Sequence, residues 1–144
     1  ALSVHLAQVA RGMDAGTDRA DGVPASLIFG GLAGGLYSIK ASDGTLNTAF
    51  GDNGIVNLKT PEVMQTGPNA NYSLLSAPTI YKNLVIIGAG TGEGAGGSLA
   101  GTGPAGDTRA WDARTGKLVW TFHTVPRPGE FGYDTWRENS AVKR

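Results

Sequence analysis

Short apolar runs separated by glycine-rich turns dominate the pattern of this chain. The run ASLIFGG (25–31) is compact and bounded by glycines, which is typical of a buried strand. The run GLYSIKA (35–41) alternates between two faces with a period of two, the signature of a β-strand. The same reasoning predicts a short strand within 54–60 and two more within 77–88, one on each side of Lys82-Asn83.

The stretch GDTRAWDARTGKLVW (106–120) predicts a hairpin, because two strand-like runs flank a tight turn. In such a turn Asp112 accepts hydrogen bonds from backbone amides, Thr115 does so more weakly, and Gly116 supplies the positive φ. The second strand places three apolar side chains on one face: Leu118, Trp120 and Phe122.

Two parts of the chain resemble each other. SLIFGG with GLYSIKASDGTL (26–46) resembles NLVIIG with DTRAWDARTGKL (83–118), and the second copy carries a longer glycine-rich loop. The matched pairs are Phe29 with Ile87, Ser38 with Ala110, Lys40 with Asp112, and Gly44 with Gly116. A repeat of short antiparallel strands is typical of a β-propeller or another β-array. The predicted fold class is therefore all-β, with two four-stranded antiparallel blades.

This repeat divides the chain into an N-terminal segment (1–24), a first blade-like repeat (25–76), a second blade-like repeat (77–136) and a tail (137–144). The first eleven residues are expected to form either a short helix or an extended segment. No strong helical pattern follows them, and 23 glycines among 144 residues favour a turn-rich β chain.

Charge and composition exclude several classes of protein. Twelve Lys and Arg balance twelve Asp and Glu, which argues against a nucleic-acid or membrane surface driven by bulk charge. The absence of cysteine excludes disulfides and thiolate metal sites. No apolar run approaches the length of a spanning helix. Without a signal-peptide pattern or an initial Met, the chain is expected to be an internal piece of a longer protein or a processed product.

Two segments, GEGAGG (92–97) and GTGPAG (101–106), fit the dinucleotide-binding pattern G-x-G-x-x-G and follow a predicted strand. A dinucleotide site also needs a helix after the motif, because the pyrophosphate binds at the N-terminus of that helix. No amphipathic helix follows either segment, and Pro104 interrupts the second. The next predicted element is a hairpin, so we reject the dinucleotide interpretation.

The segment AWDARTGKLVW (110–120) closely resembles the tryptophan-docking motif, A-x-D-x-x-T-G-x-x-x-W, of the quinoprotein dehydrogenases, which use pyrroloquinoline quinone (PQQ). The matching residues are Ala110, Asp112, Thr115, Gly116 and Trp120. SIKASDGTL (38–46) is a degenerate copy, with Lys40 at the Asp position and Thr48 at the Trp position. The segments FGDNGIVNL (50–58) and HTVPRPGEFGYDTW (123–136) also resemble the family. The resemblance implies an eight-bladed propeller of four-stranded sheets, of which this chain supplies about two blades.

The resemblance also implies a cofactor site, since PQQ and a calcium ion (Ca2+) lie near the propeller axis in this family. Gly90, Thr91 and Gly92 would line PQQ, and Glu93 would ligate the calcium, because a hard cation prefers carboxylate oxygen. Arg11 would hold the anionic and quinone oxygens of PQQ. The alternatives are a solvated surface loop for Glu93 and a surface position for Arg11.

No residue of this chain matches the family's catalytic base, an Asp in a later blade, so the resemblance implies no catalytic residue here. His5 and His123 lie far apart in the sequence and share no metal-ligand spacing. The tryptophans Trp111, Trp120 and Trp136 are interpreted as structural rather than redox-active.

Two functions of different classes are compatible with these observations. The resemblance implies part of a PQQ-dependent dehydrogenase that oxidises an alcohol or sugar by hydride transfer to PQQ, with calcium polarising the quinone. The partners would be the remaining propeller blades and a small alcohol or sugar, in the periplasm, with no nucleic acid. The alternative is a non-catalytic fragment that acts as a structural or self-associating module, in which copies of the chain together close a ring.

Overall fold

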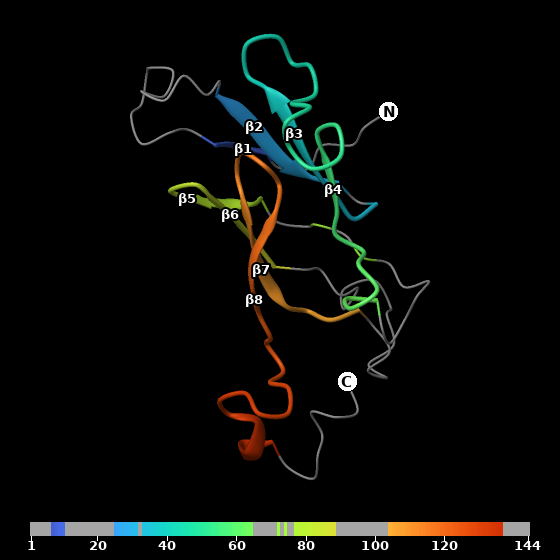
Figure 1. Cartoon of the computed structure of the whole chain (residues 1–144), viewed down its shortest axis with the longest axis vertical. Coiled ribbons are helices and arrows are strands. Elements are labelled where there is room, and N and C mark those ends of the chain that lie inside the picture. Colours follow the sequence, from blue (N-terminus) through green and yellow to red (C-terminus); the bar gives the residue numbers. More distant parts are fainter. Residues whose placement is uncertain are drawn as a thin grey trace.

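The structure is a computed structural model that describes residues 7–10, 25–31, 33–64, 72, 74, 77–88 and 104–136. It contains two antiparallel four-stranded sheets, in each of which the strands follow chain order (Figure 1). The first sheet comprises β1 (Ala7–Ala10), β2 (Ser26–Gly30), β3 (Gly35–Lys40) and β4 (Ile55–Asn57). The second comprises β5 (Thr79–Tyr81), β6 (Leu84–Ile87), β7 (Thr108–Asp112) and β8 (Leu118–Phe122).

The strands expected from the apolar pattern are confirmed, and so is the hairpin of β7 and β8. The first eleven residues include an extended strand, β1, which pairs with β2. The first sheet therefore begins before residue 25, where the first repeat was placed. In the described part of the chain the only helical element is a short 3-10 helix, η1 (Tyr133–Thr135), and no helix there is long and apolar enough to cross a membrane.

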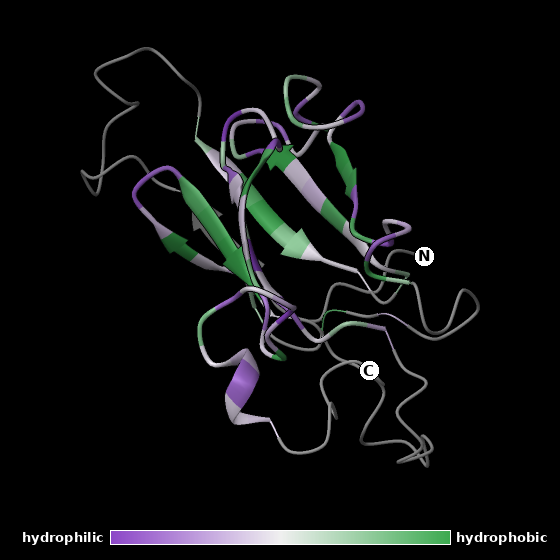
Figure 2. Cartoon of the chain, turned by 60° about the horizontal axis from the view of Figure 1, so that its bottom comes forward, coloured by the Kyte–Doolittle hydropathy of each residue, from purple (hydrophilic) through white to green (hydrophobic). Residues whose placement is uncertain are grey.

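Among the described residues, an apolar cluster joins the two sheets. Figure 2 shows hydrophobic residues concentrated in the strands, with hydrophilic residues in the turns and in η1. Ile28, Leu36 and Val85 are fully buried in this cluster. Each such side chain contributes about 1.5–3 kcal/mol by leaving water. The other members come from both repeats and from the segments between them: Phe50, Leu58, Val63, Met64, Tyr72, Leu74, Ile87, Trp111 and Ala113.

The internal repeat is visible in the backbone hydrogen bonds of the two turns. Gly44 donates to the carbonyl of Lys40 at 2.9 Å, and Gly116 donates to the carbonyl of Asp112 at 2.8 Å. Both glycines have positive φ, 74° at Gly44 and 69° at Gly116. The turn backbone is therefore the same in both sheets, although Lys40 replaces the aspartate in the first.

The strand registers also match between the two sheets. Phe29 lies opposite Tyr37 in the first sheet, and Ile87 lies opposite Arg109 in the second. The sequence comparison matches Phe29 of the first repeat with Ile87 of the second. The registers confirm that these two residues occupy equivalent positions in their sheets.

Candidate functional site

The turn between β7 and β8 is organised by one carboxylate. Asp112 Oδ1 accepts hydrogen bonds from the Thr115 amide at 2.8 Å, the Thr115 hydroxyl at 2.9 Å and the Arg114 amide at 3.1 Å. Asp112 Oδ2 accepts from the Asn83 side chain at 3.2 Å. Burial raises the pKa of Asp112, but the hydrogen bonds from Thr115, Arg114 and Asn83 outweigh it and hold the pKa below its ordinary value. The expected role of Asp112 as a turn acceptor is confirmed.

This turn contacts the first sheet directly. The Gly51 amide donates to the carbonyl of Thr115 at 2.9 Å. A Cβ on Gly116 would lie 2.7 Å from the Gly51 nitrogen and 2.8 Å from Cγ2 of Val56. Glycine is therefore required at 116 by the close approach as well as by its φ. The turn between β7 and β8, which we call the motif turn, therefore packs directly against the first sheet.

The edge of the second sheet at β8 is not covered by any of the residues that the structure describes. β8 is an edge strand, and Phe122 is 63% and Trp120 38% exposed. Leu118 and Val119, which point to opposite faces as neighbours on a strand, are also exposed. The apolar face predicted for Leu118, Trp120 and Phe122 thus has no covering element in the described part of the chain.

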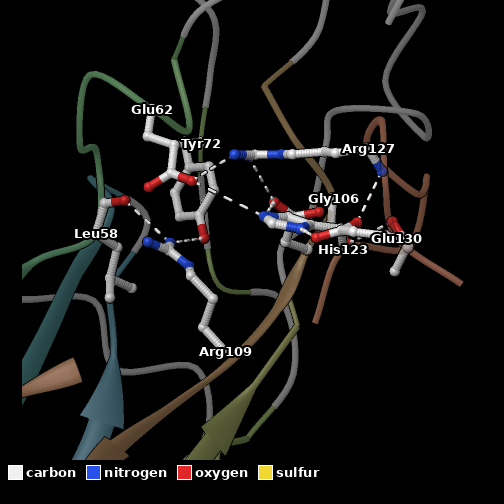
Figure 3. A network of polar contacts seen from close by, with 10 residues as sticks. Leu58, Glu62, Tyr72, Gly106, Arg109, His123, Arg127 and Glu130 are labelled. Atoms are coloured by element: carbon white, nitrogen blue, oxygen red, sulfur yellow. Dashed lines mark hydrogen bonds and ion pairs between the residues drawn. The ribbon is translucent and has the colours of Figure 1, made fainter. Parts of the chain in front are cut away.

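A polar cluster lies where β8 ends, and we call it the His123 cluster (Figure 3). Its members are Glu62, Asp107, His123, Arg127 and Glu130. His123 Nδ1 lies 2.6 Å from Glu130 Oε1. Arg127 donates to Glu62 Oε1 at 2.8 Å from its side chain and to Glu130 Oε2 at 2.7 Å from its backbone amide. His123 Nε2 faces Glu62 Oε1 at 3.8 Å and Asp107 Oδ2 at 3.9 Å.

Next to this cluster, Arg109 is buried and bridges the two repeats (Figure 3). Its Nη2 donates to the carbonyl of Leu58 at 3.0 Å and contacts the Tyr72 hydroxyl at 2.6 Å. Its guanidinium lies 4.9 Å from the centre of the Trp111 ring and 5.7 Å from that of Tyr72. Burial of a guanidinium costs free energy unless its N–H groups and its charge find such partners.

The His123 cluster and the buried Arg109 both lie where the glycine-rich segment joins the second sheet. That segment runs between the end of β6 and the start of β7, and Asp107 directly precedes β7. The Ala105 amide donates to the carbonyl of Val63 at 2.9 Å, and the Thr124 hydroxyl donates to the carbonyl of Gly106 at 3.3 Å. The C-terminal end of the glycine-rich segment is therefore held by residues from both repeats.

The residues expected to contact PQQ or calcium, Arg11, Gly90, Thr91, Gly92 and Glu93, all lie outside the described residues. Within the described part of the chain, no three His, Asp or Glu side chains form a group able to hold a metal ion.

The His123 cluster was not predicted from the sequence. The sequence shows that His123 shares no metal-ligand spacing with His5 and lies beside the end of a blade, but Glu62 and Asp107 come from segments that show no shared pattern with it. The only available signal was the resemblance of residues 123–136 to a family segment.

The sequence matches the family described as "PQQ: Glucose/ethanol/alcohol dehydrogenase, beta-propeller domain" over residues 4–144. The chain belongs to this family. The dehydrogenase subunit of the alcohol dehydrogenase (quinone) of Gluconobacter oxydans (strain 621H) is 32% identical over 129 residues, with coverage of 81% of this chain and 15% of that protein. Quinohemoprotein alcohol dehydrogenase ADH IIB of Pseudomonas putida is 41% identical over 78 residues, with coverage of 54% of this chain and 10% of that protein.

The solved structure of quinohemoprotein alcohol dehydrogenase ADHIIG from Pseudomonas putida HK5 matches with a TM-score of 0.52 and 27% identity. The match covers 76% of this chain and 14% of that one. The two sheets are accordingly blades of a quinoprotein β-propeller, and the chain spans about one seventh of the relatives' length.

Proposed function

We propose that this chain is a portion of a PQQ-dependent dehydrogenase that oxidises an alcohol or a sugar, and that it forms one wall of the PQQ and calcium site. Membership of the PQQ propeller family over residues 4–144 carries this proposal. When bound, PQQ supplies the hydride acceptor of such a reaction. The catalytic base belongs to a part of the longer protein outside this chain.

The proposed wall is the glycine-rich segment together with Arg11. In the described residues, the start of this segment at Gly88 is open, because a Cβ there would meet no atom within 4 Å. Gly90, Thr91 and Gly92 would let the backbone approach the planar cofactor, and the Arg11 guanidinium suits its anionic groups. The calcium proposal rests on Glu93 alone, since the described residues offer no metal group of their own.

Ligand-dependent stabilisation tests this proposal. PQQ with calcium, at about 100 times the dissociation constant, is expected to stabilise the chain by about 2.7 kcal/mol. That corresponds to a rise in the melting temperature of roughly 5–10 °C for a domain of this size. Glu93→Gln is expected to abolish the part of this stabilisation that depends on calcium. Arg11→Gln is expected to reduce the rise in melting temperature that PQQ causes.

Matched controls are Asp43→Asn and Arg114→Gln, which make the same chemical changes in the two exposed turns. Both should respond to PQQ as the unmodified chain does. A melting temperature that is unchanged by PQQ and calcium would contradict the proposal that this chain carries the cofactor wall.

A second candidate function is a non-catalytic module that associates with copies of itself. The uncovered apolar strand β8 favours this alternative, because an edge strand with exposed Trp120 and Phe122 is prone to association. In the first proposal the remaining blades of the longer protein cover β8. Light scattering separates the two, since a closed ring of copies has a defined mass of about four chains at concentrations above its dissociation constant. We also propose a periplasmic location, which fractionation of cells that produce the full-length protein tests.

A further inference from the structure

The turn that precedes β4 contains the one Asn-Gly pair of the sequence, Asn53-Gly54. Both residues have positive φ, 52° at Asn53 and 95° at Gly54, as in a two-residue type I′ turn. The flanking residues close this turn by a reciprocal pair of backbone hydrogen bonds, from the Asp52 amide to the Ile55 carbonyl at 2.7 Å and from the Ile55 amide to the Asp52 carbonyl at 3.2 Å. The Asn53 side chain is exposed and donates to Asp52 Oδ1 at 2.9 Å.

An Asn-Gly pair is chemically reactive, because glycine has no side chain to shield its backbone nitrogen. The Gly54 nitrogen, once it has lost its proton to solvent, can attack Cγ of Asn53. The new N–Cγ bond closes a succinimide ring, the Cγ–Nδ2 bond breaks, and the side-chain nitrogen takes a proton from solvent and leaves as ammonia. Water then opens the ring at one of its two carbonyl carbons, which gives either aspartate or isoaspartate. In isoaspartate the main chain runs through Cγ and is one carbon atom longer.

In the folded chain, the Gly54 nitrogen is protected from this reaction. Its N–H donates to the carbonyl of Phe50 at 2.7 Å, and both residues are buried. The surroundings of Gly54 are also tightly packed, since a Cβ there would lie 3.0 Å from Cβ of Leu46. Solvent can therefore remove the amide proton, and the nitrogen can turn toward Asn53, only after the turn has opened locally.

Gly51, which lies at the start of this turn, connects the two sheets. Its amide donates to the carbonyl of Thr115 at 2.9 Å, and a Cβ on Gly116 would lie 2.7 Å from the Gly51 nitrogen. The contact therefore requires Gly51 to stay in place. An additional main-chain atom at position 53 disrupts the hydrogen bonds between Asp52 and Ile55, and Asp52 is the direct neighbour of Gly51. Lengthening the turn consequently displaces the residue through which the sheets meet.

We propose that Asn53 is a modification site at which conversion to isoaspartate separates the two sheets. The closed turn suppresses the reaction, and local opening of the turn allows it. Once isoaspartate has formed, the loss of the contact between Gly51 and Thr115 persists, because it follows from a longer main chain. This inference concerns the packing of the two sheets and does not depend on PQQ, so its failure and the failure of the function proposed above are separate results.

Peptide mapping by mass spectrometry, during incubation in mildly alkaline buffer, tests the protection of the site. Deamidation of Asn53 is expected to be at least about tenfold slower in the folded chain than in the same chain unfolded in urea. Asn57 and Asn83 are internal controls, because both are exposed but precede leucines, whose side chains shield the nitrogen. Both should deamidate far more slowly than Asn53 in urea. Equal rates at Asn53 in the folded and the unfolded chain would overturn the proposal.

A variant of the motif turn tests the connection between Asn53 and the sheet contact. Gly116→Ala is expected to raise the rate at Asn53 in the folded chain by at least about threefold, because the added Cβ displaces Gly51. Tyr72→Phe is the control, since it removes a hydroxyl that contacts Arg109 and leaves the turn before β4 unchanged. It should not alter the rate. A folded Gly116→Ala chain that deamidates as slowly as the parent would contradict the proposal.

The consequence for the two sheets is measured on the modified chain itself and needs no variant of the motif turn. The isoaspartate form is separated from the aspartate form by chromatography and refolded. Hydrogen-exchange protection of the Gly51 amide, which reports its bond to Thr115, is expected to fall by at least about tenfold. Asn53→Asp is the matched control, because it adds the same charge without lengthening the main chain, and it should keep the protection of Gly51. Unchanged protection in the isoaspartate form, or an equal loss in Asn53→Asp, would overturn the proposal.

Discussion

The backbone amide of Gly51 in the first sheet donates a 2.9 Å hydrogen bond to the carbonyl of Thr115 in the second. Thr115 belongs to the turn that Asp112 organises, and Gly116 lies against Gly51 and Val56. One short turn therefore closes its own hairpin and also attaches its sheet to the preceding one.

Gly116→Ala is expected to cost more stability than Gly44→Ala, although both glycines have positive φ. A left-handed alanine costs about 1–2 kcal/mol at either position. At Gly44 a Cβ meets nothing within 4 Å, whereas at Gly116 it would approach the Gly51 nitrogen to 2.7 Å. We expect an additional loss of about 1–3 kcal/mol for Gly116→Ala. Urea unfolding of the two variants measures the difference, and equal losses would argue against docking through this turn.

Asp112→Asn is expected to lower the free energy of unfolding by about 1–2 kcal/mol at pH 7, because it weakens hydrogen bonds to a charged acceptor. The pKa of Asp112 is lowered in the folded chain. Its contribution is therefore complete above the unfolded pKa of about 3.9 and is lost as the pH falls through the folded value. Chemical unfolding between pH 7 and pH 2 checks this. A difference between variant and parent that does not shrink with acid would contradict the assigned role.

Tyr72→Phe is expected to destabilise the chain by about 1–2 kcal/mol, because it removes a hydroxyl that contacts the buried Arg109 at 2.6 Å. Tyr81→Phe is the matched control, since Tyr81 is exposed on β5 and should change stability by less than about 0.5 kcal/mol. The two melting curves give the comparison. Equal effects would mean that the hydroxyl of Tyr72 does not stabilise the buried guanidinium.

Phe122→Lys is expected to reduce concentration-dependent association of the chain, because it puts a charge on the uncovered edge strand β8. Phe131→Lys makes the same change at a fully exposed phenylalanine outside the sheets and serves as the control. Light scattering over a range of concentrations measures the effect. Association that persists in Phe122→Lys but disappears in Phe131→Lys would show that the contact lies in the segment after β8 instead.

Much of the fold could be predicted from the sequence because its determinants are local. Period-two alternation located β3, and a turn of Asp, Thr and Gly located the end of β7. The repeat paired Lys40 with Asp112, and the turns around these two residues share their backbone hydrogen bonds. Even so, the alternation alone did not show that Ser38 is fully buried, with its hydroxyl contacted by the Asn47 amide at 3.4 Å.

One part of the candidate site was expected from the sequence, and the other part depends on the tertiary structure. The positions expected to contact the cofactor, Arg11 and Gly90 to Glu93, rest on resemblance and stay predictions. The His123 cluster and the buried Arg109 depend on tertiary structure, since Glu62 and His123 are separated by most of the second repeat.

The sequence by itself therefore determined the strands, the turns and the membership of the quinoprotein family, because these depend on residues that are close along the chain. Only the tertiary structure decided which charged side chains meet between the repeats. Such contacts are set by how the two sheets pack, and neither period nor spacing in the sequence encodes that packing.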